Sequence, residues 1–352
     1  LAVIMPSEKP LRHWLLPLGF VALAIVFVWV AMPVLTGIGF SLAASGSQAD
    51  RDASGRGTVK SGLSYPALLN QKNPPLLNFV AMGDTGSGML NQKRITKQLM
   101  AEQQASGFKL LLILGDVVYS YTNKAKYFND GQTFFHKEYQ SLRDKGVKIL
   151  PIIGNHDVLY DYSKQLLDFL GMPASYYDYT VGPVHFFALD TNSFDGPQAE
   201  WLKNRLTATA GSSSWQIVYG HHPVFSSGSH GNNDHLKTTL WPVLVDHHVD
   251  LYLSGHDHDY ERFKPKSGVV QIVSGGGGAG LRPFKKIKAD SAQHFSKLHL
   301  LKFEVSPTSL TMTVVDDQGH VLDTLALNKS STKPVPKAPN TPTAPKATKP
   351  AA

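Results

Sequence analysis

The stretch LSGHDHDYER, residues 253–262, places two histidines directly behind a strongly apolar run. That run, residues 249–253, has the length and composition of a buried strand, and a serine and a glycine end it. Because residues two apart in an extended segment project to the same side, His256 and His258 can face one point. Two histidines that face one point are typical of a metal site, although an isolated pair of this kind also occurs in ordinary loops.

Four other segments follow the same pattern, in which an apolar strand ends in a glycine and a ligand-type residue comes next. With the first stretch included, the residues after the glycines are Asp84, Asp116, Asn155, His221 and His256. In a sheet covered by helices, ligands collect at the carboxyl ends of the strands. Together with His258, these ends would supply two carboxylates, an amide oxygen and three imidazoles. This set is too large for one four-coordinate zinc and suits two ions bridged by a carboxylate.

The spacing of apolar residues predicts alternating strands and helices across the body of the chain. We expect strands at 76–82, 108–114, 147–153, 215–219 and 249–253, and helices at 91–104, 134–145, 198–206 and 240–248. Residues 176–180 and 184–189 predict an antiparallel hairpin. The later apolar segments, 269–273, 298–305, 310–315 and 321–327, predict closing antiparallel strands. The glycines at 275–278 suggest that backbone passes close to the site.

Five short motifs occur in order: GDTG at 83–86, GDVVY at 115–119, GNHD at 154–157, GHHP at 220–223 and GHDHDYER at 255–262. They resemble the five blocks of the calcineurin-like metallophosphoesterases and, within these, the purple acid phosphatases, with the spacing of the small tartrate-resistant type. The first block lacks the histidine of the D-x-H pattern that general metallophosphoesterases carry. Instead, Tyr119 stands three residues after Asp116, where purple acid phosphatases use a phenolate to hold ferric iron.

The resemblance implies a fold, a cofactor and a set of ligands. The implied fold is α/β, a four-layer α/β/β/α sandwich of two mixed sheets with helices outside. The implied cofactor is a dinuclear centre of Fe³⁺ with a divalent ion, Fe²⁺, Zn²⁺ or Mn²⁺. The ferric ligands would be Asp84, Asp116, Tyr119 and His258, and the divalent ligands Asp116, Asn155, His221 and His256. Ligand chemistry agrees, because carboxylate and phenolate oxygens suit a trivalent ion and imidazoles with an amide oxygen suit a divalent one.

The resemblance also implies an acid phosphatase that hydrolyses phosphate monoesters, of small molecules or phosphoproteins, by attack of a metal-bound hydroxide. His156, beside a ligand, is placed to contact the phosphate or protonate the leaving group, or else supports the ligands. His230 resembles a substrate-facing histidine of the small acid phosphatases, although Ser229 replaces the acidic residue that precedes it there. His222 holds a variable position and is not expected to bind metal.

Two rival functions remain open at this point. The same ions could serve a phosphodiesterase that acts on nucleotides or phospholipid-derived diesters. A non-catalytic surface binding protein is the other rival, suggested by the lysine- and proline-rich end of the chain.

The ends of the chain differ from its body. Residues 14–40 contain no ionisable side chain and are long enough to span a hydrocarbon core of about 30 Å. Lys9 and Arg12 precede this span, which predicts an amino terminus in the cytoplasm and a catalytic body on the outer face. Cleavage near Ala44, giving a secreted protein, is the alternative.

We therefore divide the chain into five parts. They are a cytoplasmic segment (1–13), a membrane anchor (14–40), a linker (41–75), a catalytic domain (76–328) and a disordered tail rich in lysine, proline, threonine and alanine (329–352). The net charge of +7 owes much to the tail, and no nucleic-acid-binding motif accompanies it, so we expect no nucleic-acid partner. The chain has no cysteine, which excludes disulfides, thiolate ligands and a cysteine nucleophile.

Overall fold

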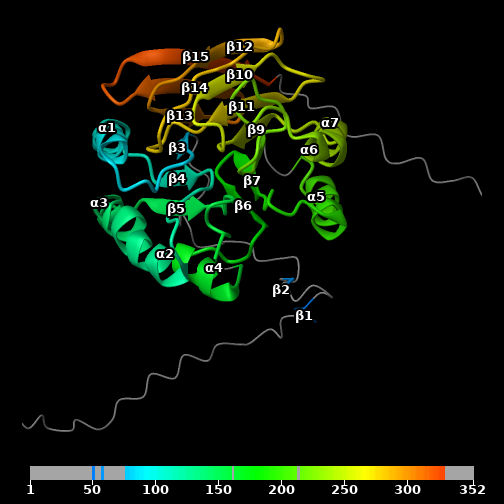
Figure 1. The fold of residues 1–352 in the computed structure, drawn as a ribbon. Coiled ribbons are helices and arrows are strands. Elements are labelled where there is room, and N and C mark those ends of the chain that lie inside the picture. The colour runs from blue at the N-terminus through cyan, green and yellow to red at the C-terminus, as the bar shows by residue number, and fades with distance from the viewer. Residues whose placement is uncertain (1–49, 52–56, 59–75, 161, 212–214, 330–352) are drawn as a thin grey trace, which may run out of the picture. The chain divides into compact units, whose positions relative to one another are not determined.

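The computed structural model describes residues 50–51, 57–58, 76–160, 162–211 and 215–329, and its main feature is a pair of mixed β-sheets (Figure 1). Two short strands, β1 (Asp50–Arg51) and β2 (Gly57–Thr58), form a separate antiparallel pair. The predicted membrane anchor and nearly all of the predicted tail lie outside the described residues. Within the described residues, no helix is long and apolar enough to cross a membrane.

The six-stranded sheet contains three adjacent parallel strands, whose carboxyl ends therefore lie on the same side of the sheet. Its order is β15 (Val321–Asn328), β14 (Ser309–Asp316), β13 (His299–Val305), β3 (Leu77–Met82), β4 (Leu110–Ile113) and β5 (Lys148–Pro151). Strands β3, β4 and β5 are parallel, and the other pairings are antiparallel. All four residues of β4 are buried, as expected for a parallel strand covered on both faces.

The seven-stranded sheet is mixed as well. Its order is β12 (Ser291–Phe295), β10 (Tyr260–Phe263), β11 (Val270–Ser274), β9 (Leu251–Ser254), β8 (Trp215–Tyr219), β7 (Val184–Ala188) and β6 (Tyr177–Val181). The predicted hairpin of β6 and β7 is confirmed. Strand β11 corrects the prediction of a purely antiparallel closing strand, because it runs parallel to β9 and antiparallel only to β10.

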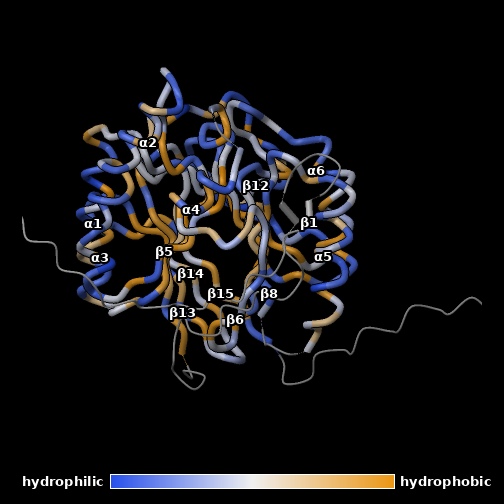
Figure 2. Tube along the Cα trace, turned by 90° about the horizontal axis from the view of Figure 1, so that it is seen from below, coloured by the Kyte–Doolittle hydropathy of each residue, from blue (hydrophilic) through white to orange (hydrophobic). Residues whose placement is uncertain are grey.

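Helices cover the outer faces of both sheets. They are α1 (Leu90–Ser106), α2 (Lys124–Gly131), the π-helix η1 (Gln132–Lys137), α3 (Gln140–Asp144), α4 (Lys164–Leu170), α5 (Gly196–Ala208), α6 (Asp234–Thr239) and α7 (Trp241–Asp246). Helices α1 and α3 lie on the side of the six-stranded sheet, and α5 and α6 lie on the side of the other sheet (Figures 1 and 2). Hydrophobic residues concentrate between these outer layers (Figure 2).

The two sheets pack through aromatic side chains. Phe79 of β3 meets Phe186 of β7 edge to face with ring centroids 5.2 Å apart, and it stacks on Phe303 of β13. On the outer face of the seven-stranded sheet, Leu202 and Leu206 of α5 belong to a second buried cluster. The structure therefore shows the expected mixed α/β fold with two mixed sheets.

One predicted helix is interrupted, and another is shorter than expected. The helix expected at 134–145 consists of η1 and α3, and the Arg143 guanidinium bonds the carbonyl oxygens of Phe135 and His136 near the break. The helix expected at 240–248 is present as α7 and ends earlier, at Asp246, and Pro242 lies in its first turn, where a missing backbone N–H is tolerated. Helices α2, α4 and α6 and strands β1, β2, β10 and β12 were not predicted.

Candidate metal centre

The residues predicted to bind metal converge where the parallel strands of both sheets end. Asp84, Asp116 and Asn155 follow β3, β4 and β5 of the six-stranded sheet, while His221 and His256 follow β8 and β9 of the seven-stranded sheet. His258 lies two residues further along the chain. The strand order therefore collects side chains from segments that are far apart in sequence.

Three predicted ligands form a first group. The Tyr119 hydroxyl donates to Asp84 Oδ1 at 2.9 Å and lies 3.0 Å from His258 Nε2, and His258 Nε2 lies 3.4 Å from the same Asp84 oxygen. Atoms held about 2.1 Å from one ion lie roughly 3.0 to 3.4 Å from one another. The spacing of these three atoms therefore fits the coordination of a single cation.

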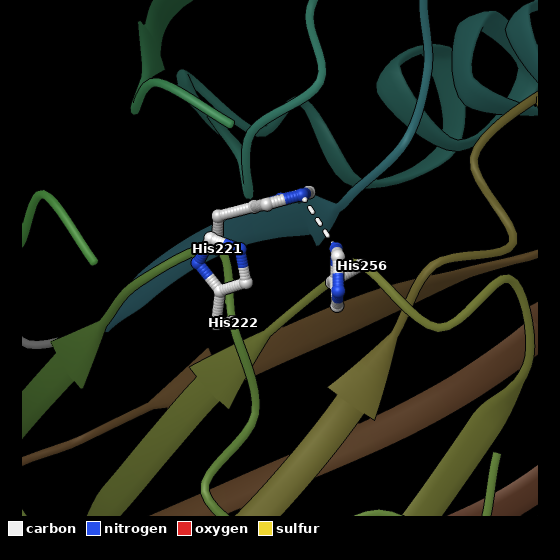
Figure 3. Close-up of side chains that lie close together, drawn as sticks. All are labelled: His221, His222 and His256. Carbon is white, nitrogen blue, oxygen red and sulfur yellow. Dashed lines mark hydrogen bonds between the residues drawn. The ribbon is translucent and has the colours of Figure 1, made fainter. Parts of the chain in front are cut away.

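Three more form a second group with the same spacing. Asn155 Oδ1 lies 3.0 Å from His221 Nε2 and 2.9 Å from His256 Nδ1. The two imidazole nitrogens are 3.3 Å apart, and Figure 3 shows His221 and His256 turned toward each other. An amide oxygen and two imidazoles at this spacing fit a divalent ion.

Asp116 lies beside both groups. Its Oδ1 is 3.4 Å from His221 Nε2, and its ligand atoms cluster with those of Asp84 and His221. Burial disfavours charge on both Asp116 and His221, yet their mutual attraction lowers the pKa of Asp116 and raises the pKa of His221 to about 10. Burial and then the charges of Asp84 and Asp116 raise the pKa of Tyr119. A bound cation would oppose this shift and favour the phenolate.

The backbone at three of these residues adopts an unfavourable conformation. Asp84, Asp116 and His256 have φ values of 60°, 49° and 71°, in the left-handed region. Each costs about 1 kcal/mol or more, and such residues cluster at functional sites. Hydrogen bonds fix the arrangement, because the His256 N–H donates to Asp84 Oδ2 at 2.8 Å and the His156 N–H donates to Asp116 Oδ1 at 2.9 Å.

The glycines before the ligands leave room for ligands from neighbouring strands. A Cβ on Gly154 would lie 2.1 Å from Asp116 Oδ1, and one on Gly255 would lie 2.5 Å from Asp84 Oδ2. The glycine-ligand pattern therefore has a steric cause at Gly154 and Gly255, where a side chain would collide with the carboxylate that follows a neighbouring strand.

Residues 77–260 match the profile of the calcineurin-like phosphoesterases. The chain belongs to this family. Among its relatives, purple acid phosphatase 4 of Arabidopsis thaliana is 26% identical over 234 residues, which are 58% of this chain and 68% of the relative. Tartrate-resistant acid phosphatase type 5 of Homo sapiens is 26% identical over 312 residues, 75% of this chain and 94% of the relative.

Among solved structures, one is GAP50, described as the anchor in the inner membrane complex of Plasmodium. It aligns with a TM-score of 0.65 at 22% sequence identity, and the alignment covers 73% of this chain and 90% of the GAP50 chain. This likeness shows the fold alone. The family and its acid phosphatase relatives support a phosphatase function for this phosphoesterase and imply a dinuclear metal centre, consistent with the two ligand groups.

Backbone carbonyls orient two of the histidines of the phosphoesterase. His221 Nδ1 bonds the carbonyl oxygen of Leu114 at 2.8 Å, and His258 Nδ1 bonds that of Gly280 at 2.7 Å. Each bond leaves the Nε2 atom free to bind an ion, and such outer partners are a usual feature of metal-binding histidines. The second bond also confirms that backbone after the glycine run approaches the site.

His156 lies at the edge of the first group. Its Nε2 is 4.0 Å from Asp116 Oδ2, and its ring packs against Tyr119 at 4.6 Å and edge-on against Tyr121 at 5.3 Å. Its Nδ1 is buried and has no hydrogen-bond partner among the residues that the structure describes. Burial lowers the pKa of His156, although the charge of Asp116 opposes the shift. The ring is thus held by packing, with its Nε2 close to the site.

His230 is held beside the second group by a residue that sequence reasoning missed. Asp257, between the two histidines of the opening stretch, bonds both the backbone N–H and the Nδ1 of His230, at 3.0 and 2.8 Å. The His230 ring stacks on His256 with centroids 4.0 Å apart. Asp257 stands inside the HDHDYER stretch, but its partner His230 lies 27 positions away, so no local signal indicated the contact.

His222 lies closer to the centre than the sequence indicated. Its ring is 4.4 Å from that of His256, and its ligand nitrogen clusters with those of His221 and His256 (Figure 3). However, its Nδ1 bonds the Thr191 hydroxyl at 2.9 Å. A hollow of about 290 Å³, lined in part by His222, His230 and His256, opens beside it.

Asp157 is a second residue that sequence reasoning missed. Its buried carboxylate accepts hydrogen bonds from the backbone N–H groups of Val117, Val118 and Gly154 and from the Tyr127 hydroxyl. It therefore ties the turn after β4 to the turn after β5, and so sets the spacing between two of the motifs.

Proposed function

We propose that this phosphoesterase is a dinuclear acid phosphatase that hydrolyses phosphate monoesters. The observation that carries the proposal is the pair of three-atom ligand groups beside Asp116, one of which contains the phenol of Tyr119. Asp84, Asp116, Tyr119 and His258 would hold a ferric ion, and Asp116, Asn155, His221 and His256 would hold a divalent ion. Two such ions supply activation of water and neutralise the charge of the phosphate.

The reaction also needs a proton donor for the leaving group, and His156 is the candidate. The leaving group of a monoester departs as an alkoxide and needs a proton, which a positioned imidazole can donate. His156 Nε2 lies close to the proposed bridging carboxylate, and the ring is fixed between Tyr119 and Tyr121. We therefore assign the proton transfer to His156 Nε2. His230, held by Asp257, would contact the substrate from the other side.

The test compares a phosphate monoester with a diester on purified protein of measured metal content. We expect p-nitrophenyl phosphate to be hydrolysed in preference to bis-p-nitrophenyl phosphate, and two metal ions per chain. Asp116→Asn should lose metal and activity together, whereas Asp168→Asn, an exposed change on α4, serves as the matched control. Faster cleavage of the diester would favour the phosphodiesterase. Protein that holds two metals yet cleaves neither ester would favour a non-catalytic binding protein.

A further inference from the structure

A basic segment lies against the candidate metal centre. Residues 282–288 contain Arg282, Lys285, Lys286 and Lys288, and no acidic residue occurs between positions 275 and 289. In the described part of the chain, none of these four side chains forms an ion pair with a carboxylate. The segment follows the glycine run, which passes under the metal ligands.

Hydrogen bonds hold this basic segment in place at both ends. The Arg282 N–H donates to the carbonyl oxygen of His258 at 3.1 Å. The Lys288 N–H donates to the Ser227 hydroxyl at 2.9 Å, and Ser227 is itself bonded to Glu261. The basic segment is thus hydrogen-bonded to the two loops that carry His258 and His230.

The Arg282 guanidinium reaches the site. Its Nη1 lies 3.0 Å from His230 Nε2 and 3.5 Å from the Ser229 hydroxyl. His230 in turn stacks on His256, a proposed metal ligand. The charge of Arg282 also acts on His258 and on Tyr121, whose ring packs against His156. The guanidinium therefore lies beside the second ligand group, through His230, and the Arg282 backbone is bonded to His258 of the first.

The contacts of Arg282 leave much of its binding capacity unused. Asp257 bonds Nδ1 of His230, which makes Nδ1 the protonated nitrogen and leaves Nε2 as the acceptor for Arg282. A guanidinium has five donors in a planar fork and binds phosphate or carboxylate in preference to a neutral acceptor. Within the described part of the chain, the guanidinium contacts a histidine and a hydroxyl, and an anion would be a better partner than either.

We infer that Arg282 determines specificity by binding a second anionic group of the substrate, either a carboxylate or a further phosphate, beside the phosphate that is cleaved. This inference rests on the proposed monoesterase function. Exposed Lys285 and Lys286 extend the positive charge away from the site. The preferred substrates are therefore phosphate monoesters with at least one additional negative charge near the ester bond.

The test uses two monoesters that differ by one carboxylate, 2-phosphoglycerate and glycerol 2-phosphate. The wild type should prefer 2-phosphoglycerate in kcat/KM, and Arg282→Gln should reduce the ratio of the two kcat/KM values about tenfold or more, mainly through KM. Arg282→Lys should retain part of the preference. Lys97→Gln removes an exposed cation from α1 and should leave the ratio unchanged.

A binding measurement separates this inference from the function on which it rests. Calorimetry should show that pyrophosphate binds the wild type more tightly than inorganic phosphate does, and that Arg282→Gln narrows the difference. If neither ester is hydrolysed but this binding difference appears, the proposed function fails and the anion site stands. A wild type without preference in either assay overturns the inference. If Arg282→Gln does not fold, Arg282→Lys provides the test, because it keeps the charge but loses the planar fork, and an ester ratio equal to that of the wild type there counts against the anion site.

Discussion

At the scale of a single residue, Tyr119 allows the identity of the metal to be tested by the colour of the protein. A phenolate bound to ferric iron absorbs visible light, so we expect the purified protein to be coloured and Tyr119→Phe to be colourless. Activity should fall less than absorbance, because Asp84 and His258 still hold the ion. Visible spectra and metal analysis of both proteins provide the measurement. Wild-type protein that contains two metals per chain but has no visible band under oxidising conditions would show that Tyr119 does not bind iron.

The role of His156 can be tested by changing the leaving group of the substrate. His156→Ala should keep both ions, since the imidazole is no ligand, and should lose turnover by about 10² or more. The loss should be smaller for aryl phosphates, whose leaving groups need no proton, than for alkyl phosphates. Rates across a series of leaving groups, with metal content measured in parallel, test this assignment. An equal loss across the series would indicate that His156 only positions the phosphate.

At the scale of elements, one carboxylate connects the two sheets next to the site. Asp323 of β15 accepts hydrogen bonds from the Tyr260 hydroxyl at 2.7 Å and from Arg262 at 2.7 and 3.0 Å, and both donors lie on β10. Strand β10 belongs to the seven-stranded sheet and β15 to the six-stranded sheet. The end of the HDHDYER stretch is thus anchored across the sheet interface.

We expect Asp323→Asn to lower the free energy of unfolding by about 2 kcal/mol near neutral pH, because charged hydrogen bonds to a mostly buried carboxylate are lost. Burial opposes ionisation, but Arg262 and Tyr260 lower the pKa of Asp323. Its contribution is therefore complete above the ordinary carboxyl pKa of about 4 and is lost as the pH falls through the lower folded value. Urea unfolding of both proteins over this range should show the difference shrinking in acid, and a constant difference would contradict this explanation.

For the whole molecule, the proposed ions would join the two sheets. Asp84, Asp116 and Asn155 come from the six-stranded sheet, and His221 and His256 come from the other. Ions that bind only the folded state stabilise it by mass action, by about 2.7 kcal/mol at a concentration 100 times the Kd. Chelation should therefore lower the melting temperature, and added metal should restore it. The shift should be smaller in Asp116→Asn, and equal melting with and without metal would argue against ions that bridge the sheets.

The sequence by itself determined which segments carry the chemistry. Strand composition and the glycine before each ligand are local features, so they indicated β3, β4, β5, β8 and β9 and the ligand that follows each. Tyr119 was identified only through the resemblance of the GDVVY motif to that of the purple acid phosphatases. Local patterns thus indicated the strands and helices, and the resemblance supplied the sandwich fold and the assignment of ligands to the two ions.

Only the tertiary structure decided how these segments meet. The direction of β11, the bond between Asp257 and His230, and the approach of Arg282 all depend on packing between distant segments. Arg282 and His230 are 52 positions apart, and the Arg262–Asp323 pair spans 61. Local propensity carries no information on such contacts, because they arise from the order of strands and the space left between buried side chains.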